Sequence, residues 1–138
     1  MAEVAYIGEE KQRERMLADK FVCGVLGAEL VEAGVGTARV ELTLRPEHMN
    51  GVGVCQGGVL FSLADFAFAA ACNYAEESIV GIEVSISYCK TVKTGKIIAE
   101  AKEIARTRST AVAEARVTDE TGKLLCVARG RGYALQPR

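Results

Sequence analysis

The chain has 138 residues, with 17 basic and 18 acidic side chains that give a formal net charge of −1. This length suits one domain with a core of its own, so we expect a single domain over residues 1–138. The balanced charge excludes the basic surface on which nucleic-acid binding relies, and 49% apolar residues is ordinary for a globular protein.

The cysteines and the N-terminus bear on cofactors and location. The number of cysteines is five, and no Cys-x-x-Cys pair or metal-ligand cluster occurs, so we predict neither a metal nor a resident cofactor. No export signal or membrane-spanning segment is recognisable, and we expect no membrane partner. Reduced thiols without an export signal favour the cytoplasm.

The first third of the chain predicts a surface helix and a β-hairpin. The strongly charged residues 9–20 favour a helix, the main part of an N-terminal helical segment over residues 1–21. Residues 22–33 and 36–44 predict two strands that turn at the glycines between them. The second strand alternates apolar and polar residues, as expected for a strand with one exposed face.

Four more strands are predicted in the second half of the chain, over residues 80–89, 96–105, 110–118 and 124–134. Alanines make one face of the third of these strands small enough to pack closely against a helix. Successive strands joined by tight turns form an antiparallel sheet. The element order therefore predicts an α+β fold, in which a curved antiparallel sheet wraps around one long buried central helix.

Residues 50–73 contain that helix. Over residues 59–72 only Ser62 and Asp65 are polar, and the Ala and Leu content favours a helix that is buried on nearly every side. Asp65 is the anomaly, because a buried carboxylate is unfavourable unless it is paired or hydrogen-bonded. It is either a structural carboxylate or a general base or nucleophile in a cleft, with a pKa raised by desolvation.

Gly57 and Gly58 lie where this helix is expected to begin. The first N–H groups of a helix lack acceptors and lie at the positive end of its dipole. Since no side chains cover them, a ligand oxygen can approach closely, which makes a candidate oxyanion hole for acyl transfer. The alternative is a flexible turn into the helix. No Gly-Lys-Ser/Thr sequence follows, which excludes a phosphate loop.

The two parts of this candidate site, Gly57 and Asp65, are far apart along the predicted helix. Asp65 lies eight residues after Gly57, a rise of roughly 12 Å along a helix, so both do not readily serve one carbonyl group from the same chain. An antiparallel pair of helices brings Gly57 of one chain close to Asp65 of the other. We therefore predict a homodimer with shared active sites around a twofold axis.

The residues around this helix resemble the hotdog-fold acyl-CoA thioesterases of the phenylacetic-acid-degradation group. The signature of that group is His-x-Asn-x-x-Gly-x-x-His-Gly-Gly, followed by an apolar helix with Leu-Ala-Asp and Ala-x-Asn. The matching residues are His48-Met49-Asn50, Gly53, Gln56-Gly57-Gly58, Leu63-Ala64-Asp65 and Ala71-Cys72-Asn73. The general strand pattern matches more weakly over residues 15–135.

The resemblance implies a hotdog fold, an acyl-CoA substrate and roles for individual residues. Asp65 corresponds to the catalytic carboxylate, and Gly57 to the backbone donor that polarises the thioester carbonyl. Asn50 corresponds to a residue that positions the attacking water or the carbonyl. Further candidates for substrate binding are Gly58, His48 and Ser62. Because dimers of this fold often pair into tetramers, the resemblance also implies a dimer of dimers.

One position departs from the signature, because Gln56 stands where the group has a His before the glycine pair. An amide donates and accepts hydrogen bonds, so an orienting role is retained. It does not titrate near neutral pH as His does. Gln56 is therefore a candidate catalytic residue without an acid or base function.

Several other side chains have two interpretations each. Arg106 and Arg108, expected in a turn, are either contacts for the phosphates of CoA or ordinary surface charges. His48 is either a substrate contact or a loop residue that caps neighbouring backbone. Cys55 is either a low-pKa nucleophile near the helix start or a small buried side chain. The aromatic residues that line either an acyl pocket or the core are Phe61, Phe66, Phe68 and Tyr74.

The predicted function is hydrolysis of an aryl- or short- to medium-chain acyl-CoA to the free acid and CoA, with Asp65 as base or nucleophile. CoA is part of the substrate, and no other cofactor is required. Two alternatives remain open: a non-catalytic acyl-CoA-binding or regulatory hotdog module, and a hotdog hydratase or dehydratase. The latter enzymes pair a His with a carboxylate, and His48 is the only His in the chain.

Overall fold

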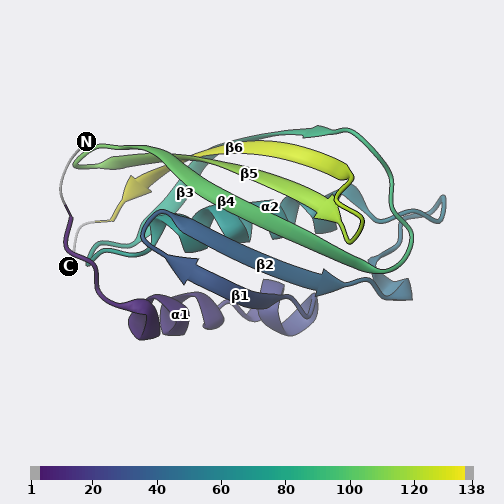
Figure 1. Cartoon of the computed structure of the whole chain (residues 1–138), viewed down its shortest axis with the longest axis horizontal. Helices are drawn as coiled ribbons and strands as arrows, with labels where there is room; N and C mark the ends of the chain where they lie inside the picture. Colours follow the sequence, from purple (N-terminus) through teal and green to yellow (C-terminus); the bar gives the residue numbers. More distant parts are fainter. Residues whose placement is uncertain (1–3, 136–138) are drawn as a thin grey trace.

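A computed structural model of the protein describes residues 4–135. It consists of a six-stranded sheet, a long central helix and a shorter N-terminal helix (Figure 1). The elements in chain order are α1 (Glu9–Leu17), a π-helical turn (Lys20–Val25), β1 (Glu29–Gly34), β2 (Thr37–Thr43), a 3-10 turn (Pro46–His48), α2 (Gly57–Cys72), β3 (Ile79–Tyr88), β4 (Lys96–Arg106), β5 (Thr110–Asp119) and β6 (Leu124–Ala134).

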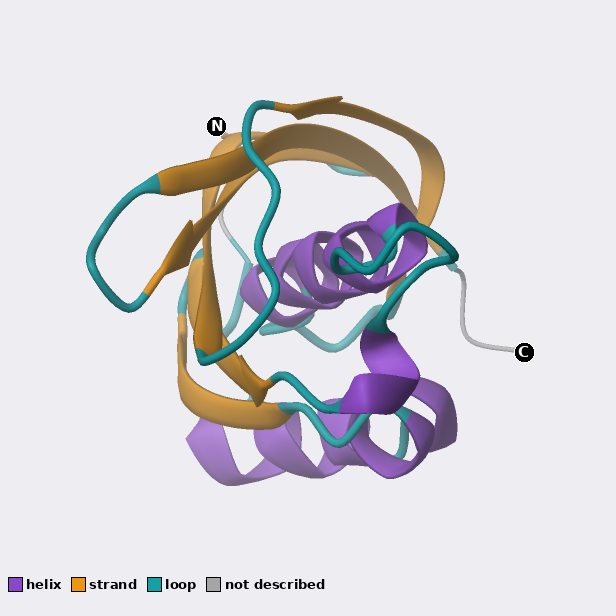
Figure 2. Ribbon diagram, turned by 90° about the vertical axis from the view of Figure 1, so that its right-hand side faces the viewer, coloured by secondary structure: helices purple, strands orange, loops and turns teal. Residues whose placement is uncertain are grey.

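All neighbouring strands of the sheet are antiparallel, in the order β1-β2-β4-β5-β6-β3. Figure 2 shows the sheet curving around α2, with α1 outside it against β1. The two edges are β1 and β3, and β3 reaches its edge position because the chain crosses from α2 to the far side of β6. The predicted α+β hotdog architecture is confirmed.

The burial of α2 explains why the sheet curves as it does. Leu63, Ala67 and Ala70 of the helix are fully buried, and so are the small residues Ala111 and Ala113 on the facing side of β5. Small side chains on the sheet allow the helix to approach closely. The core is mostly aliphatic, with Phe66, Phe68 and Tyr74 as its aromatic members. The predicted alanine face of β5 is confirmed.

One stripe of α2 is not covered by the sheet. Its partly exposed residues are spaced by three or four positions, which places them on one side of the helix. These residues are Gly57, Gly58, Phe61, Ser62, Asp65 and Ala69. The stripe lies toward β3, because a Cβ atom on Gly81 of that strand would be 3.8 Å from Oδ1 of Asp65. The helix therefore has one open face beside an open sheet edge.

The strand predicted from residue 22 is wrong, because residues 20–25 form a π-helical turn. The side chain of Asp19 accepts a hydrogen bond from the Val22 N–H and caps this turn. Val22 and Leu26 lie four residues apart and are both buried, a spacing that suits a helical turn better than a strand. Gly27 then adopts a φ of 83°, and the strand begins only at Glu29.

A glycine on β6 makes room for an aromatic ring of α2. A methyl group on Gly130 would lie 2.9 Å from the ring of Phe68. We expect Gly130→Ala to lower the free energy of unfolding by roughly 1–3 kcal/mol, because the ring has to move within a packed core. Urea denaturation measures this loss.

The matched control is Gly24→Ala, since a methyl group there meets nothing within 4 Å. Adding Phe68→Leu to Gly130→Ala should recover part of the lost stability. A Gly130→Ala protein as stable as the wild type would contradict the described packing of Phe68 on β6.

Candidate active site

A cavity of about 380 Å³ lies beside the first turn of α2. It is lined by Asn50, Val54, Cys55, Gly57, Leu60, Tyr88, Cys89, Lys90 and Thr91. The cavity thus brings together Asn50 and Gly57, two of the predicted catalytic residues, which come from the loop before α2 and from the helix itself. No carboxylate is among its lining residues.

The N–H group of Gly57 is available to a ligand in this cavity. Gly57 is the first residue of α2, and among residues 4–135 no acceptor is hydrogen-bonded to its N–H group. Gly58 differs, because its N–H group donates to the side-chain oxygen of Gln56, the N-cap residue. Of the two expected glycine donors, only the Gly57 N–H is therefore left for a ligand within the described chain.

Two side-chain amides beside Gly57 are oriented with their carbonyl oxygens bound to backbone. Oδ1 of Asn50 accepts hydrogen bonds from the N–H groups of Val52, at 3.0 Å, and Val54, at 3.1 Å. Oε1 of Gln56 accepts from Gly58. Since both oxygens are used, the NH₂ groups are the parts of these amides left for a ligand. The site therefore offers hydrogen-bond donors, as a developing oxyanion requires.

Asp65 lies outside this cavity, on the open stripe of α2. Within the described chain its carboxylate forms no ion pair with a basic side chain, and it lies against Gly81 of β3. Burial, and to a lesser degree the charge of Asp19, raises the pKa of Asp65 above its ordinary value. Both Asp65 and Gly57 belong to one continuous helix, so a rise of roughly 12 Å along the helix separates them.

His48 is buried and bonded to backbone on both ring nitrogens. Nδ1 accepts from the Arg45 N–H at 3.0 Å, and Nε2 lies 3.0 Å from the carbonyl oxygen of Leu26, to which it donates. These contacts match the interpretation of His48 as a residue that caps neighbouring backbone. They also leave neither nitrogen for the His–carboxylate pair that a hydratase uses.

The expectation that Arg106 lies in a turn is wrong. Arg106 is the last residue of β4, and its side chain is only 3% exposed. It donates to the Cys72 carbonyl at 3.0 Å, pairs with Glu103 at 3.0 Å and lies over the ring of Tyr74. A bulge in β4 between Glu103 and Ala105 shifts the alternation, so that both charged residues face inward.

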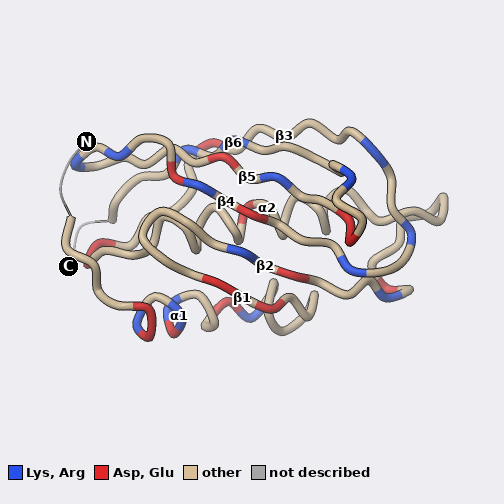
Figure 3. The backbone as a smooth tube through the Cα atoms, viewed as in Figure 1, with Lys and Arg blue, Asp and Glu red and all other residues tan. Residues whose placement is uncertain are grey.

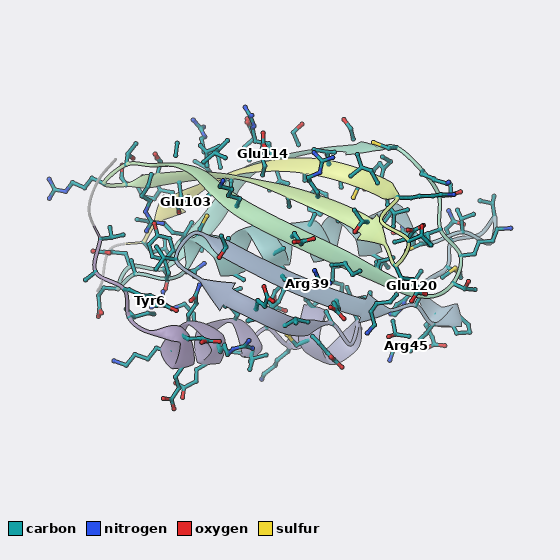
Figure 4. All side chains as sticks on the ribbon, viewed as in Figure 1. Tyr6, Arg39, Arg45, Glu103, Glu114 and Glu120 are labelled. Atoms are coloured by element: carbon teal, nitrogen blue, oxygen red, sulfur yellow. The ribbon has the colours of Figure 1, made fainter. Side chains whose placement is uncertain are left out.

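This buried pair lies at the end of α2 away from Gly57, since Cys72 is fifteen residues further along the helix, a rise of about 22 Å. Figure 4 shows Glu103 and Tyr6 at one end of the molecule and Arg45 and Glu120 at the other. Arg106 therefore has a structural position. Arg108 is exposed in the adjoining turn, and its contact with a substrate stays a prediction.

Cys55 is not the low-pKa thiol considered from the sequence, because burial raises its pKa to about 11. Phe66, Phe68 and Tyr74 are buried in the core, whereas Phe61 is partly exposed on the open stripe.

Within residues 4–135, no group of three or more His, Cys, Asp or Glu side chains is arranged to hold a metal ion. None of the helices described is long and apolar enough to cross a membrane.

Sequence reasoning missed Tyr88, the last residue of β3. Its hydroxyl donates to the Gly57 carbonyl at 2.9 Å and so ties the sheet edge to the first turn of α2. The alternation of β3 indicated a strand, but no local pattern could indicate which helix residue the Tyr88 hydroxyl reaches. Tyr88 therefore positions the backbone that carries the candidate donor.

A family model described as "Thioesterase superfamily" matches residues 52–126, more than half of the chain. The chain belongs to the thioesterase superfamily. The predicted resemblance, the hotdog fold and the enzyme class of thioester hydrolase are thereby confirmed.

Similar proteins support the assignment of this chain to the thioesterase superfamily. A putative esterase of Archaeoglobus fulgidus is 38% identical over 125 residues, which cover 90% of this chain and 81% of that protein. The 1,4-dihydroxy-2-naphthoyl-CoA hydrolase of Listeria monocytogenes is 34% identical, over 75% of this chain and 87% of its own length. The structure of the Escherichia coli PaaI protein has a TM-score of 0.87 at 26% identity and covers 92% of this chain and 93% of that one.

Replacement of Gly57 by proline tests the backbone donor in this thioesterase. Proline removes the N–H group and suits the first position of a helix, and the Gln56 backbone, at φ −63° and ψ 133°, already fits a residue that precedes proline. We expect Gly57→Pro to lower kcat/KM for a thioester by roughly 10²–10³-fold. Thiol release measures the rate.

Gly57→Ala is the matched control, because it keeps the N–H group and adds the same Cβ atom, 3.2 Å from the Tyr88 ring. It should retain most of the activity. An equal loss in both variants would assign the effect to crowding against Tyr88 and not to the donor.

Proposed function

We propose that this thioesterase hydrolyses an acyl-CoA, with an aryl or a short- to medium-chain acyl group, to the free acid and CoA. The proposal rests on the separation of two groups on one helix. The cavity at Gly57 offers hydrogen-bond donors but no carboxylate, and Asp65, whose pKa is raised, lies on the open face of the same helix. Names of similar proteins support the substrate class, since two of them are an acyl-CoA hydrolase and an acyl-coenzyme A thioesterase.

In the proposed reaction the thioester carbonyl oxygen accepts a hydrogen bond from the Gly57 N–H. Negative charge develops on that oxygen as the carbonyl carbon is attacked, and the positive end of α2 and the amide of Asn50 stabilise it. Asp65 either takes a proton from the attacking water or attacks the carbon itself. In both routes the C–S bond breaks, the thiolate of CoA gains a proton and water supplies the oxygen of the acid.

The donor and the carboxylate meet only if they come from two chains. Gly57 and Asp65 lie at equal distances, four residues each, on either side of Phe61, which is on the open stripe of α2. A twofold axis beside Phe61 would therefore place two antiparallel helices so that Asp65 of each faces Gly57 of the other. We propose a homodimer of this kind, with two shared sites.

The edge strand β3 suits the same dimer. It is a ten-residue strand with its outer edge unpaired within the described chain. Ile82 and Tyr88 on it are 51% and 52% exposed, so that a partner strand would cover apolar surface as well as backbone. Such an edge readily pairs with another strand, and β3 of a second copy would close it. Association of two dimers into a tetramer stays a prediction.

Gln56 fits this scheme as an orienting residue and not as an acid or base. Its oxygen caps Gly58, so its NH₂ group is left to donate to the thioester or to the partner's carboxylate. No cofactor beyond the CoA of the substrate enters the proposal.

Asp65→Asn tests the carboxylate. We expect it to lower the rate of thiol release by roughly 10²–10⁴-fold, because an amide neither accepts the proton nor attacks the carbon. The assay is release of CoA from aryl-, short- and medium-chain acyl-CoA substrates. A folded Asp65→Asn protein with near-wild-type rates on its best substrate would refute the assignment.

The raised pKa of Asp65 also predicts opposite effects on activity and stability. Its ionised form is disfavoured by burial, so it lowers the stability of the folded protein at pH values above its folded-state pKa. At pH 7 Asp65→Asn should therefore be at least as stable as the wild type in thermal unfolding. The wild-type rate should fall on acidification at a pH above the ordinary pKa of Asp, as the carboxylate becomes protonated.

A further inference from the structure

The segment after β3 is held firmly beside the active-site cavity. The N–H groups of Cys89 and Lys90 both donate to the carbonyl oxygen of Leu125, at 2.8 and 3.2 Å. The carbonyl oxygen of Val92 accepts from the Cys55 N–H at 2.7 Å. This segment is thus tied to β6 on one side and to the loop before α2 on the other.

Two lysines lie close together at this point. Lys90 lines the cavity, and the register that pairs Tyr88 with Cys126 continues so that Lys90 lies next to the beginning of β6, which Lys123 directly precedes. The ammonium group of Lys123 beside it lowers the pKa of Lys90 from its ordinary value. Figure 3 shows basic residues in the loop after β3 and in the turn between β5 and β6, at the same end of the molecule.

Asp119 and Glu120, the acidic residues of the same turn, accept hydrogen bonds from groups other than the two lysine ammonium groups. Oδ1 of Asp119 accepts hydrogen bonds from the hydroxyl of Thr121, at 2.6 Å, and from the backbone N–H of Lys123, at 3.0 Å. Glu120 accepts from the Lys96 N–H at 3.3 Å. Within residues 4–135, neither Lys90 nor Lys123 forms an ion pair with a carboxylate, although Lys96 does so with Glu41.

Two exposed ammonium groups that lie close together repel, and an anion placed between them removes that repulsion and binds to both. We propose that Lys90 and Lys123 form a clamp for a phosphate group of CoA at the mouth of the cavity. The clamp rests on the proposed function, and it would let the enzyme distinguish CoA thioesters from thioesters without phosphate. Neither Arg106 nor Arg108 is part of it.

The position of the clamp suits a substrate that reaches Gly57. The Tyr88 hydroxyl contacts the Gly57 carbonyl, and Lys90 follows two residues later, about 7 Å further along an extended chain. The lysine side chains extend beyond that point. The arm of CoA separates its thioester from its phosphates, so the thioester lies at Gly57 while a phosphate lies between the two lysines.

The test compares two substrates with the same acyl group, one on CoA and one on N-acetylcysteamine, which has no phosphate. We expect the double variant Lys90→Gln/Lys123→Gln to lower kcat/KM for the CoA substrate roughly tenfold, mainly through KM, and to leave the N-acetylcysteamine substrate unchanged. Lys11→Gln on α1, which is also an exposed lysine, is the control and should change neither rate.

Raising the salt concentration should lower kcat/KM for the CoA substrate more in the wild type than in the double variant, since salt screens exposed charges. An equal loss on both substrates would overturn the clamp, because the lysines would then support the site in general. No loss on either substrate would overturn it as well.

A binding measurement separates failure of the clamp from failure of the proposed function. If the wild type hydrolyses none of the aryl-, short- and medium-chain acyl-CoA substrates, the proposed function is refuted, and calorimetric titration with CoA still tests the clamp. Roughly tenfold weaker binding of CoA to the double variant, with Lys11→Gln unchanged, supports the clamp in that case. Equal binding of CoA to all three proteins overturns it.

Discussion

The structure depends on packing the apolar helix α2 against the concave face of one curved sheet. Alanines on β5 and glycines on β6 let the helix approach, and aliphatic side chains fill the space between them. A single sheet covers only part of a helix that is apolar nearly all round. The stripe that remains open carries Asp65, and the edge strand beside it stays unpaired within the described chain. The same packing that forms the core therefore leaves the surface that the second chain of the proposed dimer would cover.

The rigidity of this helix also fixes the distance between the two parts of the proposed active site. The Gly57 N–H and the Asp65 carboxylate lie on one regular helix, so no local movement of a loop brings them to one carbonyl group. In the proposed dimer the carboxylate of each chain therefore serves the donor of the other chain.

The sequence was sufficient to predict an element wherever a local pattern determines its structure. The alternation of the strands after residue 79 and the apolar run of α2 predicted these elements within one residue or two. Prediction failed at residues 22–25, where apolar content was interpreted as a strand and two local signals for a turn were missed. The side chain of Asp19 caps the turn, and Val22 and Leu26 are buried at helical spacing.

The candidate site shows the same division. Its motif placed Asn50 and Gly57 in one cavity, as expected. A bulge in β4, which the sequence does not reveal, turned Arg106 inward to Glu103. The contact of Tyr88 with Gly57 and the approach of Lys123 to Lys90 follow from strand order, which no local pattern specifies.

The most direct test of the shared site uses a heterodimer of two variants, each inactive alone, in which one chain carries Asp65→Asn and the other Gly57→Pro. Two different affinity tags allow the mixed dimer to be isolated after co-expression. If the sites are shared, one of the two sites in this dimer has both Gly57 and Asp65 intact, and roughly half of the wild-type activity returns. A purified mixed dimer without activity above its two parents would contradict the shared site.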